Sequence, residues 1–503
     1  MLARMPTHQP DVLPDRRPSR AFRLETLTAL SAGLIAACGT PGVRGVAGTA
    51  PAPNVFWTPP PARRADAPAP AQLPPDVAER VAQLKLADVI DIALRNNAAT
   101  GAAWADARAA AASYGAAQGQ YYPTLSLDGT VTAIKTVPSA GRLATKQQFL
   151  NPTLNLSWLL FDFGGRSGSI GAAREALLAA DWTHNATLQN VVLDVEQAYF
   201  DYLGTKALLG AQQTTLKEAQ TNVEAAEQRH NVGLATIADV LQARTALSQA
   251  RLSLETTEGR LQTTRGALAL SMGLPANVPY DLAVPSDTTV PPGISDSVDA
   301  LIERAVRERP DLAAERARVA AARARLSVAR SQALPSLSVG GTTAETDFLN
   351  GRPVFRNSYT ATVTLSIPLF SGGAQIYDVK AAGAAADAAA LRAHGFEQLV
   401  IYQVFNAYYA LRTANQQVRT GADLLASATQ SEQVALGRYR AGAGSLLDLL
   451  TAQAALASAR ADAIAARFSW YLALAQLTHD TGVLGLDGGT PLHVRTDSTG
   501  TPK

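Results

Sequence analysis

The sequence has little of what compact enzymes and nucleic-acid-binding proteins need. Of its 503 residues only 6% are aromatic, and the single cysteine, Cys38, excludes an intrachain disulfide. The 44 Lys and Arg residues nearly balance the 42 Asp and Glu residues, so no basic excess attracts nucleic acid. The apolar residues, 47% of the chain, are mostly Ala, Leu and Val. This composition favours long, closely packed helices over a thick globular core.

The motifs of catalytic and metal sites are also missing. The six histidines are scattered without the paired spacing of metal ligands, and no Gly-x-Ser-x-Gly elbow or Cys/His pair supplies a nucleophile. The glycine-rich turn at 163–168 lacks the Gly-Lys-Ser/Thr ending of a phosphate loop. We therefore expect no enzyme, no metal site and no cofactor.

The N-terminal residues have the features of a secretory signal. Arg16, Arg17, Arg20 and Arg23 precede an apolar run from Leu27 to Ala37, which is too short to span a bilayer as a mature helix. Small residues stand directly before Cys38, as in a bacterial lipobox, in which the thiol is lipidated and becomes the mature N-terminus. We interpret 1–37 as a lipoprotein signal peptide and 38–81 as a Pro/Ala-rich tether. An ordinary signal with a chance cysteine is the alternative.

The rest of the chain contains two copies of one unit. At an offset of 209 residues Phe161 falls on Phe370, and the match continues without a gap to Leu247. Upstream the offset is 212, and the three-residue difference lies in the loop between the two strands of each unit, where insertions are tolerated. We assign repeat 1 to 82–280, a connector to 281–297, repeat 2 to 298–487 and a tail to 488–503.

Each repeat contains a β-hairpin, at 123–161 and 335–370, that suits a bilayer. Apolar and polar residues alternate over 124–133 and again over 153–160, and the polar residues are mostly Ser and Thr. A soluble sandwich would show the same alternation. A polar face of hydroxyls and a strand length of about ten residues favour a wet lumen inside a membrane barrel. The sequence contains no run of 18 apolar residues, so a mature protein that crosses a membrane must cross it with β-strands.

Four strands cannot close a membrane barrel, since known membrane barrels begin at about eight strands. Open strand edges are not viable in hydrocarbon, because their backbone groups find no partners there. The sequence therefore predicts that several copies of the chain assemble.

The remaining segments predict helices too long for a globule. Residues 165–231 contain no proline and would form a helix on the order of 100 Å long. A second helix is expected over 238–272, and single helices over 86–120 and 298–333 precede the strands. Apolar residues, most of them leucine, recur every seven residues, as in a coiled-coil seam. These positions are Val240, Leu247, Leu254, Leu261 and Leu268 in repeat 1, and Leu449, Leu456, Ala463, Trp470 and Leu477 in repeat 2.

With these features together, residues 82–487 resemble the TolC family of outer-membrane efflux proteins, and the lipobox makes the chain most similar to its OprM-type lipoprotein branch. The most specific matches are the segments 231–241 and 438–450. The resemblance implies a homotrimer in the outer-membrane lipid, with a periplasmic helical tunnel on which an adaptor protein and an inner-membrane pump dock. The expected fold class is an α+β membrane protein with an internal two-fold repeat. It combines a long antiparallel α-helical coiled-coil barrel with a β-barrel that takes four strands from each protomer.

By the same resemblance, the turns between paired helices lie at the periplasmic tip, and Asp239 and Asp448 match acids that ring the closed aperture. Repulsion among carboxylates near one axis would favour bound cations or open states. Each Asp would alternatively cap its helix, and both roles are compatible. Thr451 stands where some members carry a second Asp. The tip turns expected to contact the adaptor comprise Gly233, Leu234, Thr236, Gly442, Gly444 and Ser445.

Gly444 departs from members in which an Arg at this place links neighbouring helices, so the aperture is expected to be gated differently. Tyr199 and Tyr408 match a common Ala-Tyr pair and are expected to pack inside the helical bundle. The expected function is a passive trimeric duct that exports small molecules in a tripartite efflux system. A duct for type I protein secretion and a periplasmic coiled-coil scaffold without a pore are the alternatives.

Overall fold

The computed structural model describes residues 84–136, 145–284, 296–349 and 356–483. These residues belong to one of the two units into which the chain divides, 71–503. The predicted signal peptide (1–37), the predicted lipidation site Cys38, the predicted tether and the predicted tail lie outside the described residues.

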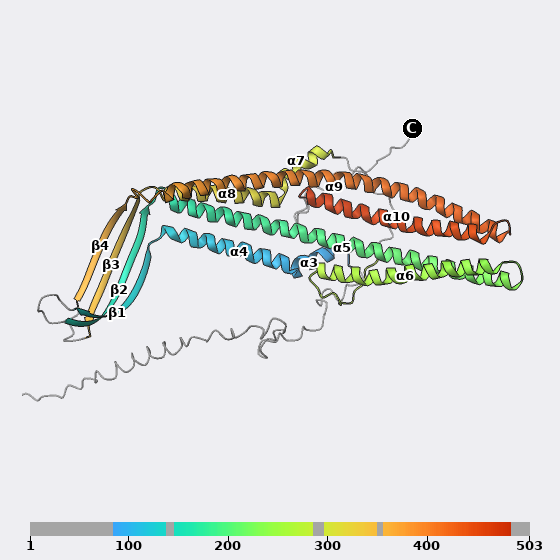
Figure 1. The fold of residues 1–503 in the computed structure, drawn as a ribbon, viewed down its shortest axis with the longest axis horizontal. Helices are drawn as coiled ribbons and strands as arrows, with labels where there is room; N and C mark the ends of the chain where they lie inside the picture. Colours follow the sequence, from blue (N-terminus) through green and yellow to red (C-terminus); the bar gives the residue numbers. More distant parts are fainter. Residues whose placement is uncertain (1–83, 137–144, 285–295, 350–355, 484–503) are drawn as a thin grey trace, which may run out of the picture. The chain divides into compact units, whose positions relative to one another are not determined.

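Apart from one short 3₁₀ helix in repeat 1, the described elements of the two repeats have the same order (Figure 1). The longest helices, α5 and α9, each contain 67 residues and are therefore about 100 Å long. Repeat 1 comprises α3 (Leu86–Asn96), α4 (Ala98–Gln118), the short 3₁₀ helix η3 (Gly119–Tyr121), β1 (Thr124–Thr136), β2 (Thr145–Phe161), α5 (Gly165–Asn231) and α6 (Ile237–Ser271). Repeat 2 comprises α7 (Val298–Glu308), α8 (Pro310–Ser331), β3 (Ser336–Phe348), β4 (Arg356–Ser366), α9 (Ala374–Arg440) and α10 (Leu446–Asp480).

The helix that precedes the strands is broken in both repeats, so the prediction of single helices over 86–120 and 298–333 was wrong. Asn97 adopts an extended conformation and its side chain accepts a hydrogen bond from the Ala99 N–H at 2.8 Å, which starts a new helix. In repeat 2, Pro310 disfavours a helical conformation at Arg309 and then begins α8. The breaks let α3 pack on α5 and α7 on α9.

The four strands form one antiparallel sheet in the order β1-β2-β3-β4, and β2 and β3 join the repeats. The predicted alternation is confirmed, because facing residues across the sheet share their polarity. Ser126 pairs with Asn155 and Asn155 with Thr342, whereas Leu125 pairs with Leu156. The strands extend further than the alternation predicts. The antiparallel pairing of β1 with β2 continues to Thr136, through positions that Lys and Gln residues occupy.

In the described residues the core consists of three clusters, one mainly within repeat 1, one within repeat 2 and one at the tips where helices of both repeats pack together. The predicted coiled-coil seam is confirmed in part. Six of its ten positions are buried (Val240, Leu268, Leu449, Leu456, Trp470 and Leu477), and four are only half-buried in the single chain (Leu247, Leu254, Leu261 and Ala463). Tyr199 is buried in the first cluster with α3 residues, and Tyr408 packs against the second cluster around Val404. The predicted packing role of both tyrosines is therefore confirmed. Among the described residues, no helix is both long and apolar enough to cross a membrane.

Candidate functional site

The turns that join α5 to α6 and α9 to α10 are built alike. Gly233 and Gly442 have φ angles of 77° and 73°, which glycine adopts without a steric cost. The N–H of Leu234 donates to the Arg229 carbonyl at 2.7 Å, and the N–H of Ala443 donates to the Arg438 carbonyl at 2.9 Å. This pattern closes the end of each long helix and reverses the chain. It explains why the glycine recurs at the repeat offset.

The two predicted aperture acids cap the helices that follow these turns. The Asp239 N–H donates to Thr236 Oγ1 at 3.2 Å, and the Thr236 N–H donates to Asp239 Oδ2 at 2.8 Å. Ser445 and Asp448 make the same reciprocal pair, at 3.1 and 3.2 Å. Each Asp is therefore the third helical residue of a capping box, which satisfies free N–H groups at the helix start. The capping role considered from the sequence is confirmed.

Asp448 is exposed and is held in its ionised form. Hydrogen bonds from the Ser445 hydroxyl and N–H lower the pKa of Asp448, and the nearby Arg438 charge acts in the same direction. An open groove of about 480 Å³ lies beside it, lined by residues of α9, α10 and the turn between them, which include Arg438, Thr451 and Gly444. The charge of Asp448 is therefore presented to the surroundings of the tip.

The two tips differ in the surface that they present. Repeat 1 exposes Val232 and Leu234, and Ile237 and Leu241 continue this apolar surface onto α6. Repeat 2 has only small residues at the turn. A Cβ added at Gly444 would lie 3.1 Å from the Cβ of Arg438, so a larger residue requires the turn to shift. The tips are therefore not interchangeable for a docking partner.

Sequence reasoning missed the contact that joins the two tips. The Arg229 guanidinium lies 4.6 Å from the centre of the Tyr439 ring, and Arg229 Nη1 donates to the Tyr439 carbonyl at 3.4 Å. The repeat offset pairs Arg229 with Arg438, which instead donates to its own turn at Ala443. The repeat therefore identified equivalent arginines but not their different contacts. Below this contact, a buried cluster holds the tips together: Val223, Ala226, Val240, Ala243, Leu446 and Leu449.

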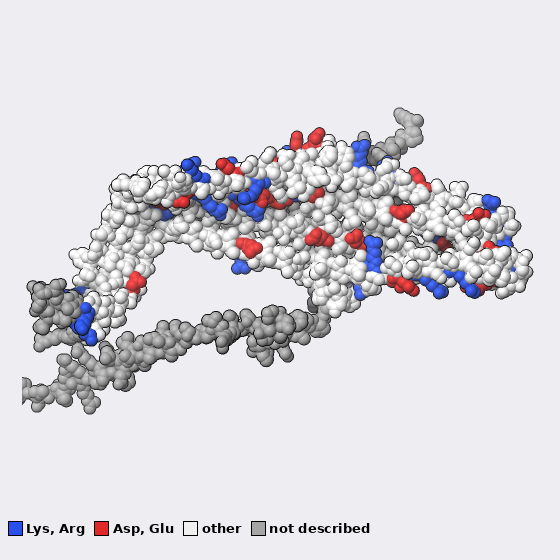
Figure 2. Space-filling view, in the orientation of Figure 1, with Lys and Arg blue, Asp and Glu red and all other residues white. Residues whose placement is uncertain are grey.

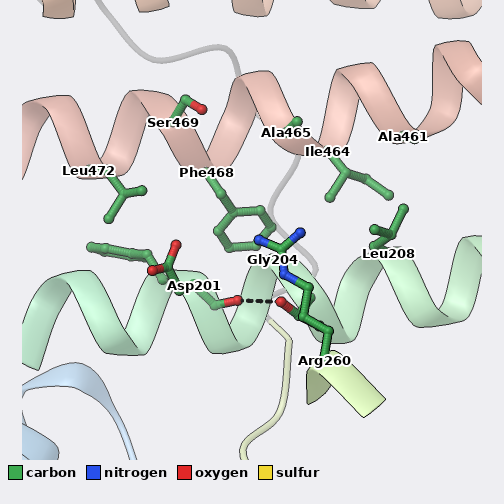
Figure 3. Close-up of a pocket in the computed structure, with 12 residues that line it drawn as sticks. Asp201, Gly204, Leu208, Arg260, Ala461, Ile464, Ala465, Phe468, Ser469 and Leu472 are labelled. Atoms are coloured by element: carbon green, nitrogen blue, oxygen red, sulfur yellow. Dashed lines mark hydrogen bonds between the residues drawn. The ribbon is translucent and has the colours of Figure 1, made fainter. Parts of the chain in front are cut away.

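A cavity of about 160 Å³ lies further along the helices, between α5, α6 and α10 (Figure 3). Phe468 points from α10 toward α5 beside Gly204, where a Cβ would approach its ring to 3.1 Å. Burial raises the pKa of Asp201 and the Arg260 charge opposes this shift. The cavity is too small for more than a few atoms of a ligand, and its close packing indicates a helix–helix contact.

Charged side chains are sparse on the sheet. On the face that Figure 2 shows, Lys, Arg, Asp and Glu are scattered over the helices and are few on the strands. Of the six charged residues in the strands, only Asp128 lies away from the loop ends. Within the described ranges, no group of three or more His, Cys, Asp or Glu side chains lies together as a metal site.

Two helical hairpins of matching length, each joined to a pair of strands with one apolar exposed face, define the class of outer-membrane channel proteins. The structure is similar to the crystal structure of a membrane protein from Pseudomonas aeruginosa, with a TM-score of 0.70, 25% identity and coverage of 85% of this chain and 99% of that one.

Known sequences point to the same class. Protein CyaE of Bordetella pertussis is 30% identical over 448 residues, which cover 88% of this chain and 91% of CyaE. The toluene efflux pump outer membrane protein TtgC of Pseudomonas putida is 25% identical, with 76% and 80% covered. The family model described as outer membrane efflux protein matches residues 89–274 and 301–483, so the chain belongs to this family. The resemblance to the TolC family is thereby confirmed.

Proposed function

We propose that this chain is the outer-membrane duct of a tripartite efflux system, a passive trimer that exports small molecules to the exterior. One observation carries the proposal beyond family membership: the sheet has one exposed apolar face and one face of hydroxyl and amide groups. Leu127 and Val363 lie on the apolar face, opposite the polar face, and are 74% and 72% exposed in the single chain. Such strands are stable when lipid covers the apolar face and water the other.

The free edges of the sheet support assembly. In the described strands, β1 pairs only with β2 and β4 only with β3, so each has one side without a partner. Unpaired backbone groups in hydrocarbon cost several kcal/mol each, and pairing β4 of one protomer with β1 of the next removes them. Three protomers, the number that the family resemblance implies, would give a twelve-stranded barrel.

Exposed apolar side chains also follow α9. Leu391, Tyr402 and Phe405 are exposed in the single chain, although α9 packs on α8 and α10 with its other sides. Contact with a neighbouring protomer would cover them. The helices would then surround the periplasmic tunnel.

Aromatic residues gather where the strands meet the helices. Tyr122, Phe161 and Phe370 are exposed at this end, and Trp158 Nε1 donates to the Tyr121 carbonyl at 2.9 Å. Aromatic girdles of this kind lie at the boundary between lipid and water. They support a barrel that starts at this level and helices that remain outside the bilayer.

The tips then serve as the periplasmic aperture and the adaptor contact. Asp239 and Asp448 from three protomers would form the acidic ring, in addition to their capping role. The adaptor would contact the turn residues of both hairpins, including Leu234 and Gly444. Lipidation of Cys38, as in the OprM-type branch, would tether the trimer to the membrane. No cargo is assigned; TtgC is named for toluene, and the proposal for this chain extends to small molecules in general.

Two lysine variants test the duct. Val363→Lys places a charge on the apolar face, at a cost of about 2–4 kcal/mol in a bilayer. Thr362→Lys places the same charge at the neighbouring residue, which lies on the opposite, polar face of the sheet. We expect trimers and conductance in planar bilayers from the parent and from Thr362→Lys, and loss of insertion for Val363→Lys. A parent protein that stays monomeric and does not conduct, or equal behaviour of the two variants, would contradict the proposal.

A further inference from the structure

Two phenylalanines interrupt the polar face of the sheet. Thr132 of β1 faces Phe149 of β2, and Phe149 faces Phe348 of β3, so the three side chains form one row on the same face. The ring centres of Phe149 and Phe348 lie 6.0 Å apart with an interplanar angle of 56°. Both rings are half-buried and retain accessible surface.

The four rows next to this pair on the helix side contain no large apolar side chain, and the row after them contains Leu159 with Ser338 and Thr364. The adjacent row consists of Thr130, Asn151, Thr346 and Arg356, and the Thr346 hydroxyl donates to Asn151 Oδ1 at 3.2 Å. The next rows contain Asp128, Thr153, Ala344 and Ser358, then Ser126, Asn155, Thr342 and Thr360, then Thr124, Ser157, Gly340 and Thr362. The phenyl pair is thus an apolar site with hydrogen-bonding groups on its helix side, and Ile134 of β1 lies on the same face in the next row on its loop side.

We propose that Phe149 and Phe348 form a contact site for the aromatic or aliphatic part of small-molecule cargo, on the lumen face near the outer end of the duct. The inference rests on the proposed duct, which places the loop ends of the strands outside the cell. Aromatic rings 4.5–7 Å apart in tilted arrangements favour further aromatic partners, and ring faces attract organic cations. The neighbouring hydroxyl and amide groups suit the polar part of such a molecule.

The site narrows the passage without closing it. A barrel of eight strands is just filled by its own side chains, and a larger barrel has room beyond them. Two rings from each of three protomers would therefore line the wall and leave an open path. A molecule in transit would touch them and dissociate again, which is what a conducting pathway requires.

The competing explanation is that the two rings only join β2 to β3 as a cross-strand pair. In that case they stabilise the sheet but do not slow or bind a passing molecule. The two explanations differ in whether an aromatic probe occupies the space beside the rings.

A cysteine protection experiment distinguishes them in the full chain inserted into bilayers. Thr132→Cys places a thiol opposite Phe149, and Thr124→Cys places one on the same face at the helix end of β1 as the control. Each thiol is modified with a water-soluble methanethiosulfonate from the loop side, with tetraphenylphosphonium or tetraethylammonium present. Both probes are monovalent cations, so electrostatic effects cancel, and the parent protein reports any labelling of Cys38.

We expect tetraphenylphosphonium to slow modification of Thr132→Cys about fivefold, which corresponds to roughly 1 kcal/mol of aromatic contact, while tetraethylammonium has little effect. Neither probe should protect Thr124→Cys. The protection should disappear in a Phe149→Ser/Phe348→Ser background and weaken with Phe348→Ser alone, which guards against misfolding of the double variant.

Protection that persists without the rings, or no protection in a conducting Thr132→Cys channel, would overturn the contact site and leave the duct intact. A protein that forms no conducting trimer would overturn the duct itself, and the contact site with it.

Discussion

The guanidinium of Arg229 lies over the ring of Tyr439, 4.6 Å from its centre, and so joins the two helix tips within one chain. Arg229 lies in the last turn of α5 and Tyr439 in the last turn of α9, so separation of the hairpins breaks this contact. A cation–π contact at an exposed site contributes about 0.5–1 kcal/mol. It is one of the contacts that keep the tips together.

Arg229→Gln should therefore raise the leak conductance of the closed channel a few-fold, because the tips separate at a lower free-energy cost. Single-channel recordings of open probability measure the effect. Arg244→Gln is the matched control, since Arg244 pairs with Glu227 inside one hairpin at an exposed position. Equal leak from the two variants would show that the contact between the tips does not restrain the aperture.

Substitutions at the repeat 2 cap separate the charge of Asp448 from its capping role. Ser445→Ala removes the cap side chain but keeps the carboxylate, at a cost of about 1 kcal/mol in helix stability. Asp448→Asn removes the charge and keeps an oxygen that can accept the Ser445 N–H. If an acidic ring binds cations at the aperture, Asp448→Asn should raise leak and reduce cation selectivity, whereas Ser445→Ala should leave selectivity unchanged.

Asp448→Ala removes both contributions and should raise leak at least as much as Asp448→Asn. A lowered thermal midpoint with unchanged conductance in all three variants would leave Asp448 as a cap alone. Reversal potentials in a salt gradient, together with thermal unfolding, provide the two readings.

Glu196 of α5 predicts a pH dependence of stability. Burial raises its pKa to about 7, and the attraction of His479 opposes this only in part. Glu196 Oε2 is buried without a hydrogen-bond partner. The folded state therefore binds the proton of Glu196 more tightly than the unfolded state. Below about pH 4.5 Glu196 is protonated in both states and does not change the stability of the protein. As the pH rises from about 4.5 to about 7, Glu196 increasingly destabilises the folded state.

Glu196→Gln should therefore raise the thermal midpoint above pH 7 and have little effect near pH 4.5. The expected gain is about 1–2 kcal/mol, after allowance for partial exposure of the side chain. Glu258→Gln, at an exposed position on α6, controls for a general loss of negative charge. A constant difference between wild type and Glu196→Gln across this pH range would refute the assignment.

Two glycines near the repeat 2 tip should respond in opposite directions to alanine. Gly442→Ala forces a left-handed backbone with φ near 73° on a residue with a Cβ, at a cost of about 1 kcal/mol. Gly437 lies in α9 and a Cβ there meets no atom within 4 Å, so Gly437→Ala should stabilise the helix by up to about 1 kcal/mol. Thermal unfolding of the two variants compares them directly, and destabilisation by both would argue against this account of the turn.

The sequence by itself determined the elements that depend on local chemistry and on repetition. Alternation identified the strands, the absence of proline predicted the span of α5, and the repeated Gly and Asp at the tips marked two turns with caps. It did not locate the helix breaks at Asn97 and Arg309. An isolated Asn is compatible with a helix interior, and a proline that begins one helix resembles a proline that ends another.

Only the tertiary structure decided which equivalent residues make different contacts. Arg229 reaches the neighbouring tip while Arg438 binds its own turn, because the two hairpins pack against each other asymmetrically. Arg309, only 4% exposed, pairs with Asp311 and also donates to Gln403 of α9, 94 residues away in sequence. Phe149 and Phe348 meet because β2 and β3 pair in one register. Each of these contacts depends on residues distant in sequence, and local patterns contain no information about how such segments pack.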